Sequence, residues 1–126
     1  MLIRRLKDII GTDRDVHWGN GTSRRLLVAA DDRGSTLTDT HIEPMTETLL
    51  RYDNHLEACY CIEGGGSVVV GPLEHVIELG TLYAPEKREE HKLVAGPNGM
   101  RLICLFSPAL TGAETHRIAV GEPSGY

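Results

Sequence analysis

The run Glu57-Ala58-Cys59-Tyr60-Cys61-Ile62, followed closely by Gly64-Gly65-Gly66, decides the fold of this chain. It has the composition of a strand, in which residues two apart share a face. A second run, Gly80-Thr81-Leu82-Tyr83-Ala84-Pro85, is rich in turn formers and precedes His91. The two runs predict the rim of a small β-barrel, at which a carboxylate, a phenol and an imidazole come together.

Length, composition and charge limit what the chain can be. Its 126 residues are enough for one core, so we expect a single domain over residues 1–126. A net charge of -5 gives no basic surface for nucleic acid and no polybasic patch for a membrane. Residues 1–8 carry too many charges for a signal peptide or a membrane span, and the three cysteines are typical of a reducing compartment. We therefore expect a cytoplasmic protein.

Strand-like runs recur along the chain, separated by Gly, Pro, Asp or Asn, as in a sandwich or barrel. Residues 2–10 predict a strand that passes into a short helix, and residues 15–22 predict a loop. Residues 108–126 have no clear period, and we expect them to lie across the barrel as a C-terminal lid that buries little apolar area. The fold class is all-β, a small barrel with one or two short helices, and strands are expected at 24–30, 36–43, 46–53, 57–63, 67–71, 75–79, 90–95 and 100–107.

Alternation along these strands places polar, thiol and aromatic side chains on shared faces. If Glu57 points inward, the sets would line one cavity suited to a small polar ligand. The sets are Thr38 with Thr40, Leu50 with Tyr52, Glu57 with Cys59 and Cys61, and Leu102 with Cys104 and Phe106.

Glu57, Tyr83 and His91 are the candidate metal ligands. A carboxylate, a phenol and an imidazole suit Fe(II), Mn(II) or Zn(II), and three protein ligands leave positions open for water or substrate. The alternative is a surface glutamate, a buried tyrosine and a solvated histidine. The residues alone leave both interpretations open.

The arginine pair and the cysteines each have a functional interpretation and a purely structural one. Alternation sends only one of Arg24 and Arg25 inward, where a guanidinium could bind a carboxylate in two-pronged fashion; two solvated ion pairs are the alternative. Cys59 and Cys61 have the wrong spacing for a zinc or redox motif, so we expect small buried residues with an apolar role, as for Cys104.

The tail carries Glu114 and His116. They could form an acid–base couple that closes over the cavity. The alternative is that both are ordinary exposed loop residues.

Several longer runs resemble the L-ectoine synthase family of the cupin superfamily. They cover nearly the whole chain, and the last of them is long and specific to that family. A typical cupin has two histidines where this chain has Leu50 and Tyr52, which argues against the common histidine-rich oxygenase centre. The resembling runs are Gly11–Arg14, Tyr52–Ala58, Gly80–Ala84 and Cys104–His116.

The resemblance implies a jelly-roll-like cupin barrel that forms a homodimer. It implies a lyase that closes N-γ-acetyl-L-2,4-diaminobutyrate into the compatible solute ectoine with loss of water, in the response to osmotic stress. It also implies Fe(II), or another divalent metal, on Glu57, Tyr83 and His91. The implied substrate-binding residues are Arg25, Thr38, Thr40, Tyr52, Cys104, Phe106, Glu114 and His116, and those implied in catalysis are Tyr52, Glu114 and His116.

Two positions depart from the family pattern. The tryptophan common in the loop before Arg25 is Gly21 here, with Trp18 nearby as a substitute, and a polar residue, often asparagine, is Thr38. These two changes leave open which substrate the protein uses. The other interpretations are a non-catalytic cupin that binds a small zwitterion or sugar acid, a cupin isomerase or oxygenase, and a related cupin enzyme with another substrate. Iron-dependent turnover of the acetylated diamine would separate them.

Overall fold

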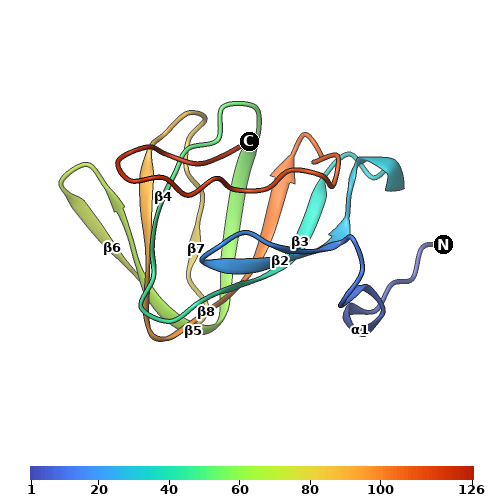
Figure 1. Ribbon diagram of the computed structural model, residues 1–126, viewed down its shortest axis with the longest axis horizontal. Coiled ribbons are helices and arrows are strands. Elements are labelled where there is room, and N and C mark those ends of the chain that lie inside the picture. Colours follow the sequence, from blue (N-terminus) through green and yellow to red (C-terminus); the bar gives the residue numbers. More distant parts are fainter.

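The computed structural model describes residues 1–126 and shows one eight-stranded antiparallel sheet that folds back on itself (Figure 1). One short helix, α1 (Leu6–Ile9), precedes the strands, and a 3-10 turn spans Ala29–Asp31. The all-β class is thereby confirmed. The strands are β1 (Asp15–His17), β2 (Gly21–Leu27), β3 (Thr36–Ile42), β4 (Glu47–Leu50), β5 (Leu56–Val70), β6 (Leu73–Ile77), β7 (Leu82–Tyr83) and β8 (His91–Ser107).

The two long strands, β5 and β8, pair along most of their length and belong to both halves of the barrel. The first half of β5 and the second half of β8 lie beside β7 and β3, and β2 and β1 extend that half. The other halves of β5 and β8 lie beside β6 and β4. Inward side chains of both halves therefore enclose one core.

Glycines make the bend at which β5 and β8 pass from one half of the barrel to the other. A Cβ at Gly64 would lie 2.1 Å from the Gly99 carbonyl oxygen, and one at Gly66 would lie 2.0 Å from that of Val94. The pairing register shifts between Gly64 and Gly66. Side chains are absent here because the two backbones come into contact.

Our expectation that these glycines form a turn between two strands is wrong. They lie inside β5, and residues 96–99 likewise lie inside β8. Glycine-rich bends within a strand and glycine turns between strands have the same local composition, and only the pairing partner distinguishes them. Two smaller corrections follow. Residues 15–17 form β1 where a loop was expected, and no strand precedes α1.

The C-terminal segment crosses the end of the barrel at which β5 begins, shown in red in Figure 1. Leu110 is 1% exposed and belongs to the hydrophobic core, and Tyr126 packs against that core. Ser124 pairs through its backbone with Leu49 and Arg51 at the end of β4. The expectation that residues 108–126 bury little apolar area is therefore wrong, because both ends of the segment are anchored on the barrel.

Asp31 fastens the N-terminal segment to the barrel. Its carboxylate accepts hydrogen bonds from Arg4 at 2.9 Å, Arg14 at 3.0 Å and the backbone N–H of Val28 at 3.0 Å. The two guanidinium groups, with the Val28 N–H, hold the pKa of Asp31 well below its ordinary value. No helix of the structure has the length and apolar character needed to cross a membrane.

Candidate active site

A small cavity lies between the barrel and the C-terminal segment. Its volume of about 30 Å³ leaves room for only one or two water molecules. The cavity brings together residues from six strands and from the tail, as the alternation of the sequence predicts for most of them. The predicted residues that line it are Thr40, Leu50, Tyr52, Glu57, Cys59, Tyr83, Leu102, Cys104, Phe106 and His116.

Glu57 enters the cavity from the start of β5. Its side chain is buried, and Oε1 has no hydrogen-bond partner. Burial raises its pKa to about 7, against the opposing influence of Cys59 and Tyr52. A buried carboxylate oxygen without a partner is costly, so it marks a position at which a cation or a donor is expected.

His91, at the start of β8, presents one free nitrogen. Its Nδ1 lies 3.0 Å from the carbonyl oxygen of Glu89, which fixes that nitrogen as the donor of a neutral ring. Nε2 is buried without a partner and keeps its lone pair, and burial lowers the pKa of the imidazole. A ring oriented by a backbone carbonyl, with its second nitrogen free, is the arrangement found in metal-ligating histidines.

Tyr83 is near both of these groups. It pairs with Cys59 across β7 and β5, lines the cavity, and its ring centroid lies 6.5 Å from that of His91. His91 itself borders a groove on the other side of Tyr83. Two unpartnered donor atoms close to a phenol fit a divalent metal with oxygen and nitrogen ligands.

His116 is one of the two tail residues that line the cavity. Its Nε2 lies 3.2 Å from the Tyr52 hydroxyl and its Nδ1 lies 2.9 Å from Ser124 Oγ. Burial and the positive charge of Arg25 lower its pKa to about 4, so the ring is neutral at pH 7. A neutral imidazole has one donor and one acceptor nitrogen, so His116 can either accept a hydrogen bond from the Tyr52 hydroxyl or donate one to it.

Glu114 does not form the predicted couple with His116. Its carboxylate folds back on its own loop and accepts hydrogen bonds from the Thr111 N–H at 2.9 Å, the Thr111 hydroxyl at 2.8 Å and the Gly112 N–H at 2.9 Å. Partial burial raises its pKa, but these bonds outweigh that influence and leave the pKa below its ordinary value. The sequence could not reveal this, because a local capping role and an active-site role use the same residue type.

Arg25 is fully buried beside the cavity and binds the tail. Its guanidinium donates to the carbonyl oxygen of Gly112 at 2.8 Å and to that of Glu114, and its Nε has no partner. The prediction that one arginine of the pair points inward is confirmed, since Arg24 is partly exposed and faces Asp15. The unpartnered Nε leaves Arg25 one donor for a ligand.

Thr38 and Thr40 form a polar patch on β3, with their hydroxyl oxygens 2.8 Å apart. Of the two, only Thr40 lines the cavity, and Ser23, which pairs with it on β2, does so as well. Ser23 was missed by the sequence interpretation. It could have been found, because it lies two residues from Arg25 on the same face.

Trp18 lines the cavity and explains the departure at Gly21. The indole lies edge-on to the His116 ring, with 4.8 Å between the centroids. A Cβ at Gly21 would lie 2.8 Å from the Trp18 ring and 2.2 Å from the backbone oxygen of His41. Gly21 therefore makes room for Trp18. Tyr126, which also lines the cavity, gave no signal in the sequence because it follows a segment without a period.

Comparisons with known proteins agree with this fold. The family model for ectoine synthase matches residues 1–122. An L-ectoine synthase of Desulfatibacillum aliphaticivorans is 51% identical over 120 residues, which cover 92% of each chain. An L-ectoine synthase of Halalkalibacterium halodurans is 44% identical over 118 residues, which cover 92% of this chain and 91% of the relative. The solved ectoine synthase from P. lautus, 44% identical, superposes with a TM-score of 0.86 over 90% of this chain and 83% of that chain. KdgF from Halomonas sp., 15% identical, shares the fold with a TM-score of 0.62 over 74% of this chain and 88% of that chain.

The fold and the cavity define a small barrel of the cupin type, with an enzyme-like site at one end. The match of the family model to residues 1–122 identifies one family within that class. The chain belongs to the ectoine synthase family.

Proposed function

We propose that this protein closes N-γ-acetyl-L-2,4-diaminobutyrate into ectoine with loss of water, as a lyase. The observation that carries the proposal is the cavity itself, in which the free oxygen of Glu57 shares the wall with Tyr83 and with a neutral His116 that is hydrogen-bonded to Tyr52. Membership of the ectoine synthase family supplies the substrate. In the reaction the free amine attacks the acetyl carbonyl, the new C–N bond forms, and the carbonyl oxygen leaves as water.

Proton transfer is assigned to Tyr52 and His116. One proton must leave the attacking amine as the C–N bond forms and a second must leave a nitrogen as the C=N bond forms, and the departing oxygen must gain these two protons to leave as water. The neutral His116 can accept a proton, and the Tyr52 hydroxyl 3.2 Å away can donate one. Glu114 is not assigned a proton, because three hydrogen bonds hold its carboxylate in its own loop.

Binding of the substrate is assigned to Arg25, Thr40 and the ring of Phe106. The free Nε of Arg25 offers a charge-assisted hydrogen bond to the carboxylate of the substrate. Thr38 orients the hydroxyl of Thr40, and Cys104 lines the same wall. Holding a flexible chain with its amine against its carbonyl removes a large part of the barrier to cyclisation.

The tail acts as a lid over this cavity. The free volume of about 30 Å³ is too small for the substrate, and His116 and Tyr126 of the tail occupy the mouth. Entry of the substrate therefore requires the tail to move. Closure would then exclude water from a reaction that releases it.

Glu57, Tyr83 and His91 would hold a divalent metal, which we take to be Fe(II). When bound, such an ion polarises a carbonyl group as a Lewis acid, and an amide carbonyl is a poor electrophile without such help. The unpartnered Glu57 Oε1 and His91 Nε2 support this assignment.

A homodimer is supported by the outer face of the sheet. Tyr60, Leu82 and Ile103 lie side by side across β7, β5 and β8, and Ala58 pairs with Leu105 next to them. Tyr60 is 45% exposed, Leu82 62% and Leu105 44%. A contiguous apolar strip of this kind marks an interaction surface. The three free, buried thiols support a reducing cytoplasm.

The test is turnover by the purified protein. The protein is freed of metal with a chelator, supplied with Fe(II) under nitrogen, and mixed with N-γ-acetyl-L-2,4-diaminobutyrate; ectoine is measured by chromatography. The Tyr52→Phe variant keeps the ring and loses the hydroxyl. It is expected to retain substrate binding, while its cyclisation rate falls about 10²–10⁴-fold. Absence of ectoine with the wild-type protein and metal would refute the proposed reaction.

A further inference from the structure

Cys59 is part of the cavity wall. It lies directly opposite Tyr83 on β7 and directly opposite Cys104 on β8, and it follows Glu57 by two residues on the same face of β5. The pairing register thus places a thiol among the groups assigned to the metal. The spacing of Cys59 and Cys61 along the sequence gave no reason to expect this.

The distances are those of a group of metal ligands. A carboxylate oxygen of Glu57 and the sulfur atoms of Cys59 and Cys104 all lie within 4.8 Å of one another. The two sulfur atoms are 3.2 Å apart, and both thiols are free and buried. Independently of these distances, Glu57 is buried and its Oε1 has no partner, so one of the three residues has an unused acceptor.

Cys61 shows what a cysteine with a purely structural role looks like on the same strand face. It is 0% exposed, and its thiol is directed at the carbonyl oxygens of Glu63 and Gly64. It does not line the cavity. Cys59, by contrast, faces a carboxylate, a phenol and a second thiol, each of which can bind a metal.

We propose that Cys59 supplies a thiolate to the metal ion that Glu57 binds, so that the site of this chain has a sulfur ligand in addition to oxygen and nitrogen. The inference rests on the metal site of the proposed function. Cys104 packs against Cys59 as its neighbour in the cavity wall and is not itself the ligand. A thiolate is a soft ligand and favours Zn(II) and Co(II) over hard ions such as Mg(II) and Mn(II).

The test uses Co(II), because a thiolate bound to cobalt gives an intense charge-transfer absorption in the near ultraviolet. The apo protein is titrated with Co(II) under nitrogen and with a phosphine reductant present, and bound metal is counted by elemental analysis. Wild type and the matched control Cys61→Ser are expected to bind Co(II) with this absorption, and Cys104→Ser is expected to keep it. Cys59→Ser is expected to lose it and to bind Zn(II) about tenfold more weakly or worse.

A second measurement keeps the test decisive if a Cys59 variant does not fold. Zinc-edge X-ray absorption of the wild-type protein reports a sulfur ligand at about 2.3 Å, separate from oxygen and nitrogen at about 2.0–2.2 Å. Bound metal without a sulfur signal overturns the assignment of Cys59 and leaves the proposed metal site intact. Persistence of the cobalt absorption in Cys59→Ser, or its loss only in Cys104→Ser, overturns it too. A wild-type protein that binds no divalent metal refutes both proposals.

Discussion

At the scale of single residues, the site is defined by polar atoms that the barrel buries without satisfying them. Glu57 Oε1, His91 Nε2 and Arg25 Nε are the buried side-chain atoms without a partner. Each lies in or beside the cavity, and each suits a different part of the proposed complex. Such atoms reduce the stability of the empty protein, and a ligand that satisfied them would restore it.

Glu57→Gln tests directly how much stability the unpartnered carboxylate oxygen costs the empty protein. The amide keeps the shape of the side chain but removes a buried, unpaired carboxylate, so the thermal stability of the metal-free protein should be equal to or higher than that of wild type. Metal content should fall, because an amide oxygen is a weaker ligand than a carboxylate. Calorimetry of chelated protein and elemental analysis measure the two effects. A large loss of stability in the metal-free variant would show that Glu57 is satisfied in the empty site.

His116 makes the stability of the protein depend on pH. Its pKa is about 4 in the folded state and lies near 6.5 ordinarily, so its contribution is fully present above about pH 6.5 and is lost as the pH falls toward 4. Asparagine does not titrate, so the free energy of unfolding of His116→Asn should decline less steeply than that of wild type between these pH values. Chemical denaturation at a series of pH values measures the slopes, with substitution of the exposed His75 as the control. Parallel slopes for wild type and His116→Asn would contradict the prediction.

At the scale of elements, the tail is held by one buried arginine and by short backbone pairing with β4. Arg25 reaches the tail from β2 and donates to two carbonyl oxygens that are separated by only one residue. A planar guanidinium can make both bonds at once, and an ammonium group cannot do so in the same geometry. Docking of the tail and recognition of the substrate therefore depend on the same side chain.

Arg25→Lys should loosen the tail and weaken substrate binding together. We expect a loss of about 1.5–3 kcal/mol in binding, the range for a hydrogen bond to a charged group. Arg24→Lys is the matched control, since Arg24 is the next residue, is partly exposed and makes a 3.4 Å ion pair with Asp15. Titration calorimetry with the substrate, under conditions without turnover, measures the affinity. An unchanged affinity in Arg25→Lys would remove Arg25 from the site.

Truncation after Leu110 separates the lid from the barrel. The core residue Leu110 is retained, while His116, Ser124 and Tyr126 are lost, so the barrel should still fold but melt at a lower temperature. The cyclisation rate should fall at least as much as it does when a single acid–base group is removed, which is about 10²–10⁴-fold. Circular dichroism and the ectoine assay measure the two effects. Normal turnover by the truncated protein would contradict the assignment of a lid.

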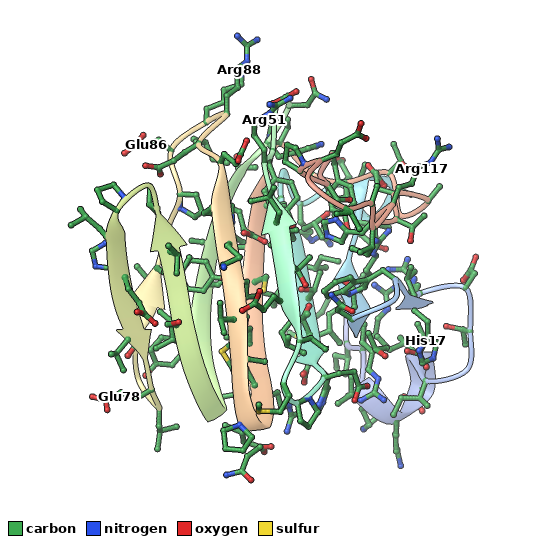
Figure 2. All side chains as sticks on the ribbon, turned by 60° about the vertical axis from the view of Figure 1, so that its left-hand side comes forward. His17, Arg51, Glu78, Glu86, Arg88 and Arg117 are labelled. Carbon is green, nitrogen blue, oxygen red and sulfur yellow. The ribbon has the colours of Figure 1, made fainter.

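At the scale of the whole molecule, the barrel has two distinct faces. The inner face of β5 and β8 is occupied by the cavity, and the outer face carries the apolar strip of Tyr60, Leu82, Ile103 and Leu105. Beside the strip, Asp39 lies opposite Ile103 and forms an ion pair with Arg101. Arg51, Glu86 and Arg88 extend into solvent at the end of the barrel where the tail lies, with Arg117 on the tail itself (Figure 2). The strip is therefore the surface best suited to a second copy of the chain.

Tyr60→Lys should dissociate the proposed homodimer. A lysine in the middle of an apolar interface introduces a charge that association would have to desolvate. Val120→Lys is the control, because Val120 is fully exposed on the tail and lies outside the strip. Light scattering at micromolar concentration gives the mass of each variant. A wild-type protein that is monomeric, or a Tyr60→Lys variant that remains dimeric, would contradict this interface.

The sequence by itself determined the all-β class and most of the inward faces. Residues two apart on a strand must share a face, so alternation alone was enough to place Glu57 with Cys59, and Cys104 with Phe106. The longer runs also identified the family. These features depend on local periodicity or on identity of residues, and both can be read along the chain.

Only the tertiary structure decided which strands are continuous, how the tail is held and what Cys59 faces. The glycines at 64–66 lie in a bend because β8 passes against them, and Glu114 turns to its own loop although its position in the sequence allowed it to face the cavity. Cys59 has a carboxylate, a phenol and a thiol as neighbours because of its register with β7 and β8. Pairing between residues far apart in the sequence fixes these properties, and no local pattern encodes such pairing.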